Sequence, residues 1–276
     1  MALPRSLLPR AVASPAEDKL PLTVAVISLN AASQIGPCLA SVAALADELL
    51  VVDSGSTDGT AEIARRHGAR VETREWLGFG KQKQHAVSLA RHDWVLCLDA
   101  DERVTEPLAR AIRGAFAGGR YRAWRMARRN RFLGRWLRHG EGYPDWTVRL
   151  FHRAHAGWSA DDVHEAVLTT AEVGTLHGDL LHDSAEDVAT YMGKQNRYTS
   201  LHAQALYRQG VRAGYWRLVA SPLMRFVKFY LLRLGFLDGG PGFAHIVIGC
   251  NNTFQKYLKL IELQKTRSTG AFQETP

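Results

Sequence analysis

The 276-residue chain contains only three cysteines, Cys38, Cys97 and Cys250, and they are scattered along it. No CxxC pair occurs, so the cysteines indicate neither a disulfide framework nor a zinc site. Cys97 lies inside an apolar run, which is typical of a free thiol in a reducing compartment. Long apolar runs are also missing, since none approaches the ~20 residues that a membrane-spanning helix needs.

Two common nucleotide-binding motifs are absent as well. The first apolar strand, expected over residues 23–29, is followed by Asn30-Ala31-Ala32-Ser33 and not by Gly-x-Gly-x-x-Gly. No Gly-x-x-x-x-Gly-Lys-Ser/Thr segment occurs anywhere in the chain. These absences argue against a nicotinamide-dependent dehydrogenase and against a P-loop nucleoside triphosphatase.

Positive charge is in excess and is concentrated in one segment. The formal net charge is +8, and the isoelectric point is about 9.6. Such a cluster suits an anionic partner, such as nucleic acid, acidic lipid or a phosphorylated glycan, and it equally suits a solvated face. The cluster comprises eight arginines, at positions 120, 122, 125, 128, 129, 131, 135 and 138.

Apolar runs alternate with helical patterns through the first 120 residues, which predicts an α/β fold with a mainly parallel, doubly wound sheet flanked by helices. From residue 186 the pattern is helical. We expect a flexible tail over 1–20, an α/β domain over 21–185 divided into halves 21–119 and 120–185, and a helical extension over 186–276. The expected strands are 23–29, 48–53, 69–73 and 93–99, and the expected helices are 33–45, 57–67, 80–90 and one from 105.

Carboxylates follow two of these apolar strands. Asp53 ends one strand, and Asp99 with Asp101 ends another. Parallel strands deliver such residues to one sheet edge, where ligands bind in open α/β sheets. Asp53 has no evident partner in the sequence, and Asp99 and Asp101 should share one side of the strand. Carboxylates at this edge suit Mg²⁺ or Mn²⁺ on a diphosphate, and therefore a nucleotide-sugar enzyme.

Lysines stand at the start of a predicted helix, in Gly78-Phe79-Gly80-Lys81-Gln82-Lys83. Backbone N–H groups and cations at a helix start favour anions, so Lys81 and Lys83 are candidates for contacting a diphosphate. An ordinary surface helix cap is the alternative interpretation.

Taken together, these motifs resemble the inverting family 2 glycosyltransferases of GT-A fold, over roughly residues 22–265. Later motifs resemble more narrowly the bacterial lipopolysaccharide inner-core glucosyltransferases of the WaaE/KdtX type. The motifs of the first group are Asn30, Val52–Thr60, Gly80–Lys83 and Leu98–Glu102, and those of the second are Pro144–Trp146, Arg149–Phe151, Val163–Glu165 and Gly235–Gly239.

The resemblance implies a catalytic base some sixty residues after the Asp-x-Asp motif. Glu165 matches that place, and Asp161 and Asp162 are rivals. The base would take the proton of an acceptor hydroxyl that attacks the anomeric carbon. The nucleotide half of the fold is then expected over 21–119 and the acceptor half over 120–185.

The resemblance also implies the ligands of the donor. For the metal, Mg²⁺ or Mn²⁺, we expect Asp99, Asp101 and a later histidine, His182, with His164 as its competitor. Arg149 is a candidate for phosphate binding and equally an ion-pair partner. The residues expected to contact the nucleotide sugar are Asn30, Asp53, Ser56, Lys81, Lys83, Asp99 and Arg149.

The segment Arg217–Arg233 interleaves basic and apolar residues, as helices on an anionic membrane surface do. A core helix whose basic side chains reach solvent is the alternative. With a lipid-linked acceptor, the former interpretation predicts an enzyme in the cytoplasm that associates peripherally with the inner membrane.

These expectations combine into one hypothesis, a transferase that moves glucose from UDP-glucose to a heptose of the phosphorylated lipid A–core. The alternative within the family is another acceptor, such as a polyprenyl phosphate, a capsule or O-antigen intermediate, or a protein. A nucleic-acid-binding protein is a distant alternative, because carboxylates at the sheet edge would repel phosphates in the absence of a metal. We therefore expect no nucleic-acid partner.

Overall fold

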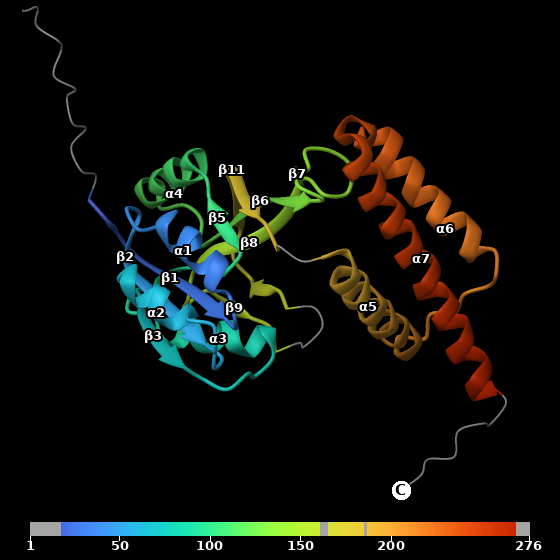
Figure 1. Ribbon diagram of the computed structural model, residues 1–276, viewed down its shortest axis with the longest axis horizontal. Helices are drawn as coiled ribbons and strands as arrows, with labels where there is room; N and C mark the ends of the chain where they lie inside the picture. The colour runs from blue at the N-terminus through green and yellow to red at the C-terminus, as the bar shows by residue number, and fades with distance from the viewer. Residues whose placement is uncertain (1–17, 161–164, 185–186, 269–276) are drawn as a thin grey trace, which may run out of the picture.

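The computed structural model describes residues 18–160, 165–184 and 187–268, and Figure 1 shows a sheet-based part beside a group of helices. The first four strands lie parallel in the order β3-β2-β1-β4, with registers that bring Asp53 and Asp99 to the same edge as Ser28. This arrangement confirms the mainly parallel sheet expected for the first half of the chain. The strands are β1 (Leu20–Ser28), β2 (Ala46–Asp53), β3 (Arg70–Thr73) and β4 (Trp94–Asp99).

Successive residues of the central strand β1 pack on opposite faces of the sheet. Val24 and Val26 belong to the larger hydrophobic cluster, which includes residues of α1, α2 and α4. Ala25 and Ile27 belong to the second cluster, together with residues of α3. Helices therefore cover both faces, as a buried parallel sheet requires. The helices are α1 (Ala32–Ala40), α2 (Thr60–Arg66), α3 (Phe79–Leu89) and α4 (Glu106–Gly118).

The first helix is shorter than expected. The sequence pattern predicted a helix over 33–45, but α1 ends at Ala40 and turns follow. Val42 and Leu45 are nevertheless fully or almost fully buried, because the turn packs them into the same cluster as α1. Their apolar character fits a buried turn as well as another turn of helix, so periodicity alone overextended the element.

Beyond β4 the sheet becomes mixed, which the alternation pattern did not predict. Strand β8 pairs antiparallel with β4 and with β6, β11 runs parallel to β6, and β5 pairs antiparallel with β11. Strand β7 extends β6 as a short hairpin, and β9 and β10 form a separate two-stranded sheet. These strands are β5 (Glu102–Val104), β6 (Ala123–Phe132), β7 (Arg135–Trp136), β8 (Asp145–His152), β9 (Ala156–Trp158), β10 (Val167–Thr169) and β11 (Val173–His182).

The helices after residue 186 form their own group, with α7 running along both α5 and α6 (Figure 1). A small cluster that includes Ala203, Leu260 and Ile261 forms its core. None of the helices in the described ranges combines the length and apolar character needed to cross a membrane. The elements are α5 (Val188–Arg208), α6 (Arg217–Phe226), a π-helical turn η1 (Val227–Leu232), a 3₁₀ turn η2 (Gly235–Asp238) and α7 (Gly239–Ser268).

One buried carboxylate joins the helical group to the sheet. Asp238, 2% exposed, accepts the backbone N–H groups of Arg138 and His139, each at 2.8 Å. The backbone N–H of Gly140 donates to the carbonyl of Arg233 at 2.8 Å. These bonds hold η2 against the loop that follows β7 and thereby fix the helices on one side of the sheet edge.

Candidate functional site

A cleft of about 800 Å³ opens at the carboxyl edge of β1 and β4, where the sequence predicted a ligand site. The sheet contributes one wall and helix α5 the other. The cleft brings together five of the predicted site residues, which are Asn30, Asp99, Asp101, Glu165 and His182. A second hollow of about 570 Å³ shares Asp99 and Glu165 with it and adds Lys83.

A buried lysine organises the carboxylates at the end of β4. Lys83, on α3, is only 4% exposed, and its Nζ lies 2.9 Å from Asp99 Oδ1 and 3.4 Å from Glu165 Oε1. The indole of Trp158 lies 4.7 Å from the same nitrogen, measured to the ring centroid. We call Lys83, Asp99 and Glu165 the lysine cluster. It joins α3, β4 and the segment before β10, which are far apart in the sequence.

Arg149 completes the charge balance behind this cluster. It is 3% exposed on β8, and its Nη2 lies 2.6 Å from Asp99 Oδ2 and 2.6 Å from Glu102 Oε1. Burial alone would raise the pKa of the Asp99 carboxyl, but the charges of Arg149 and Lys83 outweigh it and hold that pKa well below its usual range. Of the two interpretations of Arg149, the structure displays the ion pair.

Asp101 does not share the partners of Asp99. The strand ends at Asp99, so Asp101 lies in the following turn and the expected strand alternation does not apply. Its Oδ2 lies 3.3 Å from His182 Nε2, and its Oδ1 is buried without a hydrogen-bond partner among the described residues. Both carboxylates still line the same cleft.

His182 is held by the strand beside it. Its Nδ1 lies 2.7 Å from Asn130 Oδ1, and an amide oxygen can only accept, so Nδ1 carries the proton. Burial opposes the charged form, but the Asp101 carboxylate nearby raises the pKa of His182. The predicted approach of a late histidine to the Asp-x-Asp motif is thus present in the geometry.

Asp53 has partners, contrary to the expectation that it lacks them. Its carboxylate accepts the N–H groups of Gly55 and Ser56 at 3.1 and 2.8 Å, and the hydroxyls of Ser28 and Ser56 at 2.8 and 2.6 Å. These partners lie in the turn after β2 and at the end of the neighbouring strand β1, and sequence periodicity does not reveal them. Asp53 therefore shapes the turn after β2.

Asn30 and Ser56 close this turn against the end of β1. The N–H of Asn30 donates to Ser56 Oγ at 2.8 Å, and Asn30 Oδ1 accepts the N–H of Thr57 at 2.9 Å. Asn30 has φ of 49°, a left-handed conformation that asparagine tolerates better than most residues. The turn presents a fixed polar surface beside the cleft.

One predicted site residue lies away from the cleft, and three others cannot be placed. Lys81 is exposed in the first turn of α3 and does not line the cleft, although Lys83 two residues later is buried. Asp161, Asp162 and His164 lie outside the described residues. Of the candidate bases, Glu165 is the one whose surroundings are described.

Sequence reasoning missed the contribution of α5 to the cleft. Tyr191, Lys194, Gln195, Arg197 and Tyr198 all line it, at positions that recur every three or four residues of that helix. The spacing marks one face of a helix, but nothing in it says that this face meets the sheet edge. Asp101 and Tyr191 are 90 residues apart in the sequence, so the sequence does not show that they line the same cleft.

Four of the eight clustered arginines form ion pairs with carboxylates of the described residues. Arg128 pairs with Asp145 at 2.7 Å, Arg129 with Asp179 at 3.5 Å and Arg131 with Asp183 at 2.8 Å. Arg120 lies 3.6 Å from Glu172. Part of the arginine excess in this segment therefore binds β6 to the carboxylates of its neighbours.

Comparisons with known proteins agree on one family. The model for glycosyl transferase family 2 matches residues 23–165. An uncharacterized glycosyltransferase of Rickettsia typhi is 30% identical over 89% of both chains. LpsC of Rhizobium meliloti, named as a lipopolysaccharide core biosynthesis glycosyltransferase, is 29% identical over 88% of this chain and 93% of its own length.

One solved structure aligns with nearly the whole chain. It is S. aureus TarS in complex with UDP-GlcNAc, which is 12% identical over 92% of this chain and 93% of TarS, with a TM-score of 0.48.

Proposed function

The chain belongs to glycosyl transferase family 2 and has the GT-A fold, and from this premise we propose an inverting, metal-assisted transfer of glucose from UDP-glucose to a heptose of the lipopolysaccharide inner core. The likeness to LpsC supports the acceptor class. The observation that carries the proposal is the buried Lys83, which holds Asp99 and Glu165 together beside the cleft that Asp101 and His182 line.

The nucleoside is proposed to lie against the turn that Asn30 and Ser56 close and that Asp53 shapes. Helix α3 begins beside this turn, because Gln82 Nε2 donates to Ser54 Oγ at 3.1 Å. Lys83 near the start of α3 would bring positive charge toward the diphosphate, whereas Lys81 is exposed and does not line the cleft. In this proposal, Arg149 has an indirect role, because it holds the carboxylate of Asp99 in place.

A divalent cation fits Asp101 and His182. A buried carboxylate oxygen without a partner, as Asp101 Oδ1 is, costs free energy unless a cation or a donor meets it. His182 donates from Nδ1 to Asn130, which orients Nε2 toward Asp101 as a metal-binding histidine is oriented. Bound Mg²⁺ or Mn²⁺ would neutralise the charge of the leaving nucleoside diphosphate.

The remaining ligands would have to come from the substrate. Within residues 18–160, 165–184 and 187–268, no three His, Cys, Asp or Glu side chains converge as a metal site. Diphosphate oxygens commonly complete such a shell. Asp99, which the sequence suggested as a further metal ligand, already contacts Arg149 and Lys83. In this proposal, its role is to hold those two cations in place.

Glu165 is proposed as the base. Its side chain is 26% exposed and lines both hollows of the site, with Lys83 3.4 Å away to orient it. The carboxylate takes the proton of the acceptor hydroxyl while that oxygen bonds to the anomeric carbon. The bond from that carbon to the diphosphate oxygen breaks on the opposite face, which inverts the configuration. Asp161 and Asp162, outside the described residues, are the competing candidates.

A cytoplasmic location with peripheral attachment to the inner membrane is also proposed. Helix α6 and η1 expose a stripe of large apolar side chains, from 38% to 76% of their area. The exposed Lys228 borders it, whereas Arg225 is committed to Glu141. Apolar area with a basic border suits an anionic lipid surface, and so a lipid-linked acceptor. The stripe comprises Trp216, Val219, Leu223, Met224, Val227, Leu231 and Leu232.

The structure of the reaction product tests this proposal. Purified protein is incubated with Mn²⁺, heptose-containing core acceptor and a panel of nucleotide sugars, and the core is analysed by mass spectrometry and NMR. We expect one hexose added from UDP-glucose, with the anomeric configuration opposite to that of the donor. An unmodified core with every donor, or a retained configuration, would overturn the proposal. Transfer to a polyprenyl phosphate in its place would identify the alternative acceptor.

A further inference from the structure

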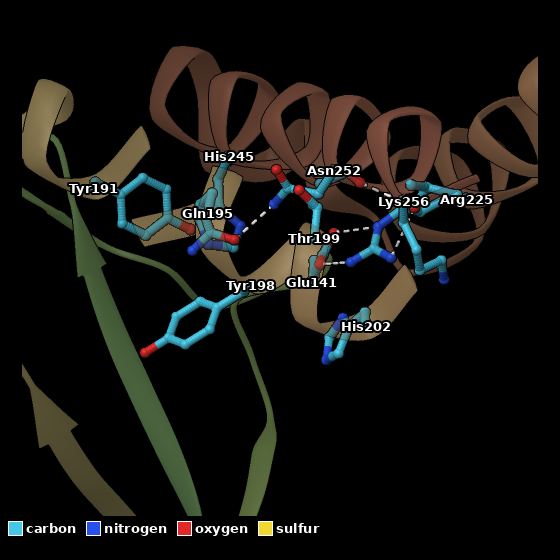
Figure 2. Close-up of a pocket in the computed structure, with 12 residues that line it drawn as sticks. Glu141, Tyr191, Gln195, Tyr198, Thr199, His202, Arg225, His245, Asn252 and Lys256 are labelled. Atoms are coloured by element: carbon cyan, nitrogen blue, oxygen red, sulfur yellow. Dashed lines mark hydrogen bonds and ion pairs between the residues drawn. The ribbon is translucent and has the colours of Figure 1, made fainter. Parts of the chain in front are cut away.

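A small polar cavity lies between α5 and α7, on the side of α5 away from the sheet core. Its volume is about 160 Å³, far less than the cleft at about 800 Å³. In Figure 2, Tyr191 and Tyr198 lie at one end of this interhelical cavity, and Arg225 and Lys256 lie at the other. The size suits one sugar unit better than a nucleotide sugar.

Two polar atoms in this cavity are buried and have no hydrogen-bond partner within the described part of the chain. They are Nδ1 of His245 and Oδ1 of Asn252, both carried by α7. Asn252 is oriented by its amide nitrogen, which donates to Gln195 Oε1 on α5 at 2.7 Å. Burial lowers the pKa of His245, so the ring is neutral and Nδ1 can donate or accept. A ligand that both donates and accepts hydrogen bonds would satisfy these two atoms.

Two cations line the cavity, Arg225 and Lys256, and Nζ of Lys256 lies 4.7 Å from the centroid of the Tyr257 ring. Arg225 is matched by Glu141, whose carboxylate accepts from both Nε and Nη2 of the guanidinium (Figure 2). A third nitrogen, Nη1, donates to Thr253 Oγ1 at 3.1 Å. The two unpartnered atoms, Nδ1 of His245 and Oδ1 of Asn252, carry no charge, so hydroxyl groups, which both donate and accept, match these atoms better than a phosphate does.

The cavity shares a wall with the cleft. Tyr191, Gln195 and Tyr198 of α5 line both hollows. A ligand unit in the cavity would thus sit beside a unit that reaches the lysine cluster. We propose that the interhelical cavity is an acceptor subsite, which binds a hydroxyl-rich saccharide unit adjacent to the sugar that receives the transferred hexose. This inference rests on the proposed transferase function and adds to it the residues that select the acceptor.

Two variants remove the unpartnered atoms separately. Asn252→Ala removes the amide, and His245→Phe removes Nδ1 while keeping a ring against Phe132, whose centroid lies 5.2 Å away. The matched control is Asn251→Ala, the same change one position earlier on α7 at a residue that does not line the cavity. Calorimetry measures binding of deacylated, heptose-containing core oligosaccharide to each protein, and a nucleotide-release assay without acceptor measures UDP-glucose hydrolysis.

We expect each cavity variant to weaken oligosaccharide binding about tenfold, as loss of one or two buried hydrogen bonds does. Hydrolysis of UDP-glucose and the KM for UDP-glucose should stay at the wild-type values, and Asn251→Ala should behave as wild type. Wild-type oligosaccharide affinity in both cavity variants would overturn the subsite. Oligosaccharide binding that depends on the cavity, in a protein that hydrolyses no nucleotide sugar, would instead refute the proposed donor chemistry while the subsite stands.

Discussion

At the scale of single residues, one buried lysine accounts for much of the site. Lys83 is 4% exposed and would be costly to bury unpaired, but Asp99 and Glu165 surround it. The sequence predicted that Lys83 contacts a diphosphate, whereas in the structure its side chain contacts the carboxylates of Asp99 and Glu165. The positive charge of Lys83 therefore acts first on Glu165, the candidate base, and on Asp99, which also pairs with Arg149.

Asp101 is predicted to set the metal dependence. Asp101→Asn removes the charge from the carboxylate with the unpartnered oxygen while keeping its shape. We expect the Mn²⁺ concentration at half-maximal activity to rise at least ~10-fold, and calorimetric Mn²⁺ binding in the presence of UDP to weaken equally. EDTA should abolish activity in the wild type.

The matched control is Asp93→Asn, an aspartate whose side chain is 62% exposed and pairs with Arg153 outside the cleft. It should leave the Mn²⁺ titration unchanged. Equal Mn²⁺ affinity in wild type and Asp101→Asn would contradict the assignment of Asp101.

At the scale of elements, the strands that carry the site could be predicted and their partners could not. The apolar runs ending in Asp53 and Asp99 are visible because a strand buried on both faces must be apolar throughout. The mixed pairing of β8, β6, β11 and β5 is not visible, since those strands mix buried and partly exposed residues and their order depends on the tertiary fold. The partners of Asp53 were not foreseen either, because hydrogen bonds to its own turn and to Ser28 of β1 leave no periodic signal in the sequence.

Glu48 on β2 is predicted to stabilise the sheet edge opposite the site. It is 4% exposed and accepts from Thr23 Oγ1 and the Arg91 N–H, both at 2.6 Å, and from Arg70 at 3.0 Å. Burial would raise the pKa of Glu48, but these hydrogen bonds outweigh it and lower that pKa. Glu48→Gln should therefore reduce the free energy of unfolding at pH 7 by about 1–3 kcal/mol.

The sign of the pH dependence follows from the depressed pKa. The ionised Glu48 stabilises the fold fully above the unfolded-state pKa, about 4.3, and this contribution is lost as pH falls toward the lower folded-state value. Urea denaturation of both proteins at pH 7 and near pH 3 measures it. The difference between them should shrink at the lower pH, and a difference that is constant or larger there would refute the assignment.

Helix α6 is predicted to carry membrane binding. Val219 and Leu223 are 72% and 59% exposed, and they lie four residues apart on one face of the helix. Each apolar side chain that enters the lipid contributes about 1.5–3 kcal/mol. The double variant Val219→Asp, Leu223→Asp should therefore lose at least ~10-fold in affinity for vesicles that contain anionic lipid, measured by co-sedimentation.

Leu168→Asp on β10 serves as the control, because Leu168 is 62% exposed on the sheet part of the molecule. It should bind vesicles as the wild type does. Equal loss in the control and the double variant, or no loss in either, would show that the α6 stripe is not the lipid-binding surface.

At the scale of the whole molecule, the site exists only where two parts meet. The sheet edge supplies the lysine cluster, Asp101 and His182, and α5 supplies the opposite wall. The sequence separates these parts clearly, with helices from residue 186 onward, but it does not say how the helices pack. Long-range packing of this kind leaves no periodic signal, which is why the wall formed by α5 could not be predicted.

The joint between the parts is predicted to govern acceptor binding. Asp238→Ala would leave the N–H groups of Arg138 and His139 unpaired in a buried place. Hydrogen exchange should then quicken in α6 and α7 while β1, β2 and β4 keep their protection. The KM for the acceptor should rise, whereas hydrolysis of UDP-glucose should persist. A uniform loss of protection from hydrogen exchange across the sheet would contradict the prediction that Asp238 affects only the helices and acceptor binding.

The most direct test of the central claim is nucleotide release by Glu165→Gln beside wild type. The assay uses UDP-glucose, Mn²⁺ and heptose-containing core, with Glu172→Gln, an exposed glutamate paired with Arg120, as the control. Loss of the base should lower kcat about 10²–10⁴-fold at an unchanged KM for UDP-glucose, and the control should match wild type. Wild-type turnover in Glu165→Gln would contradict the account and transfer the role of base to Asp161 or Asp162.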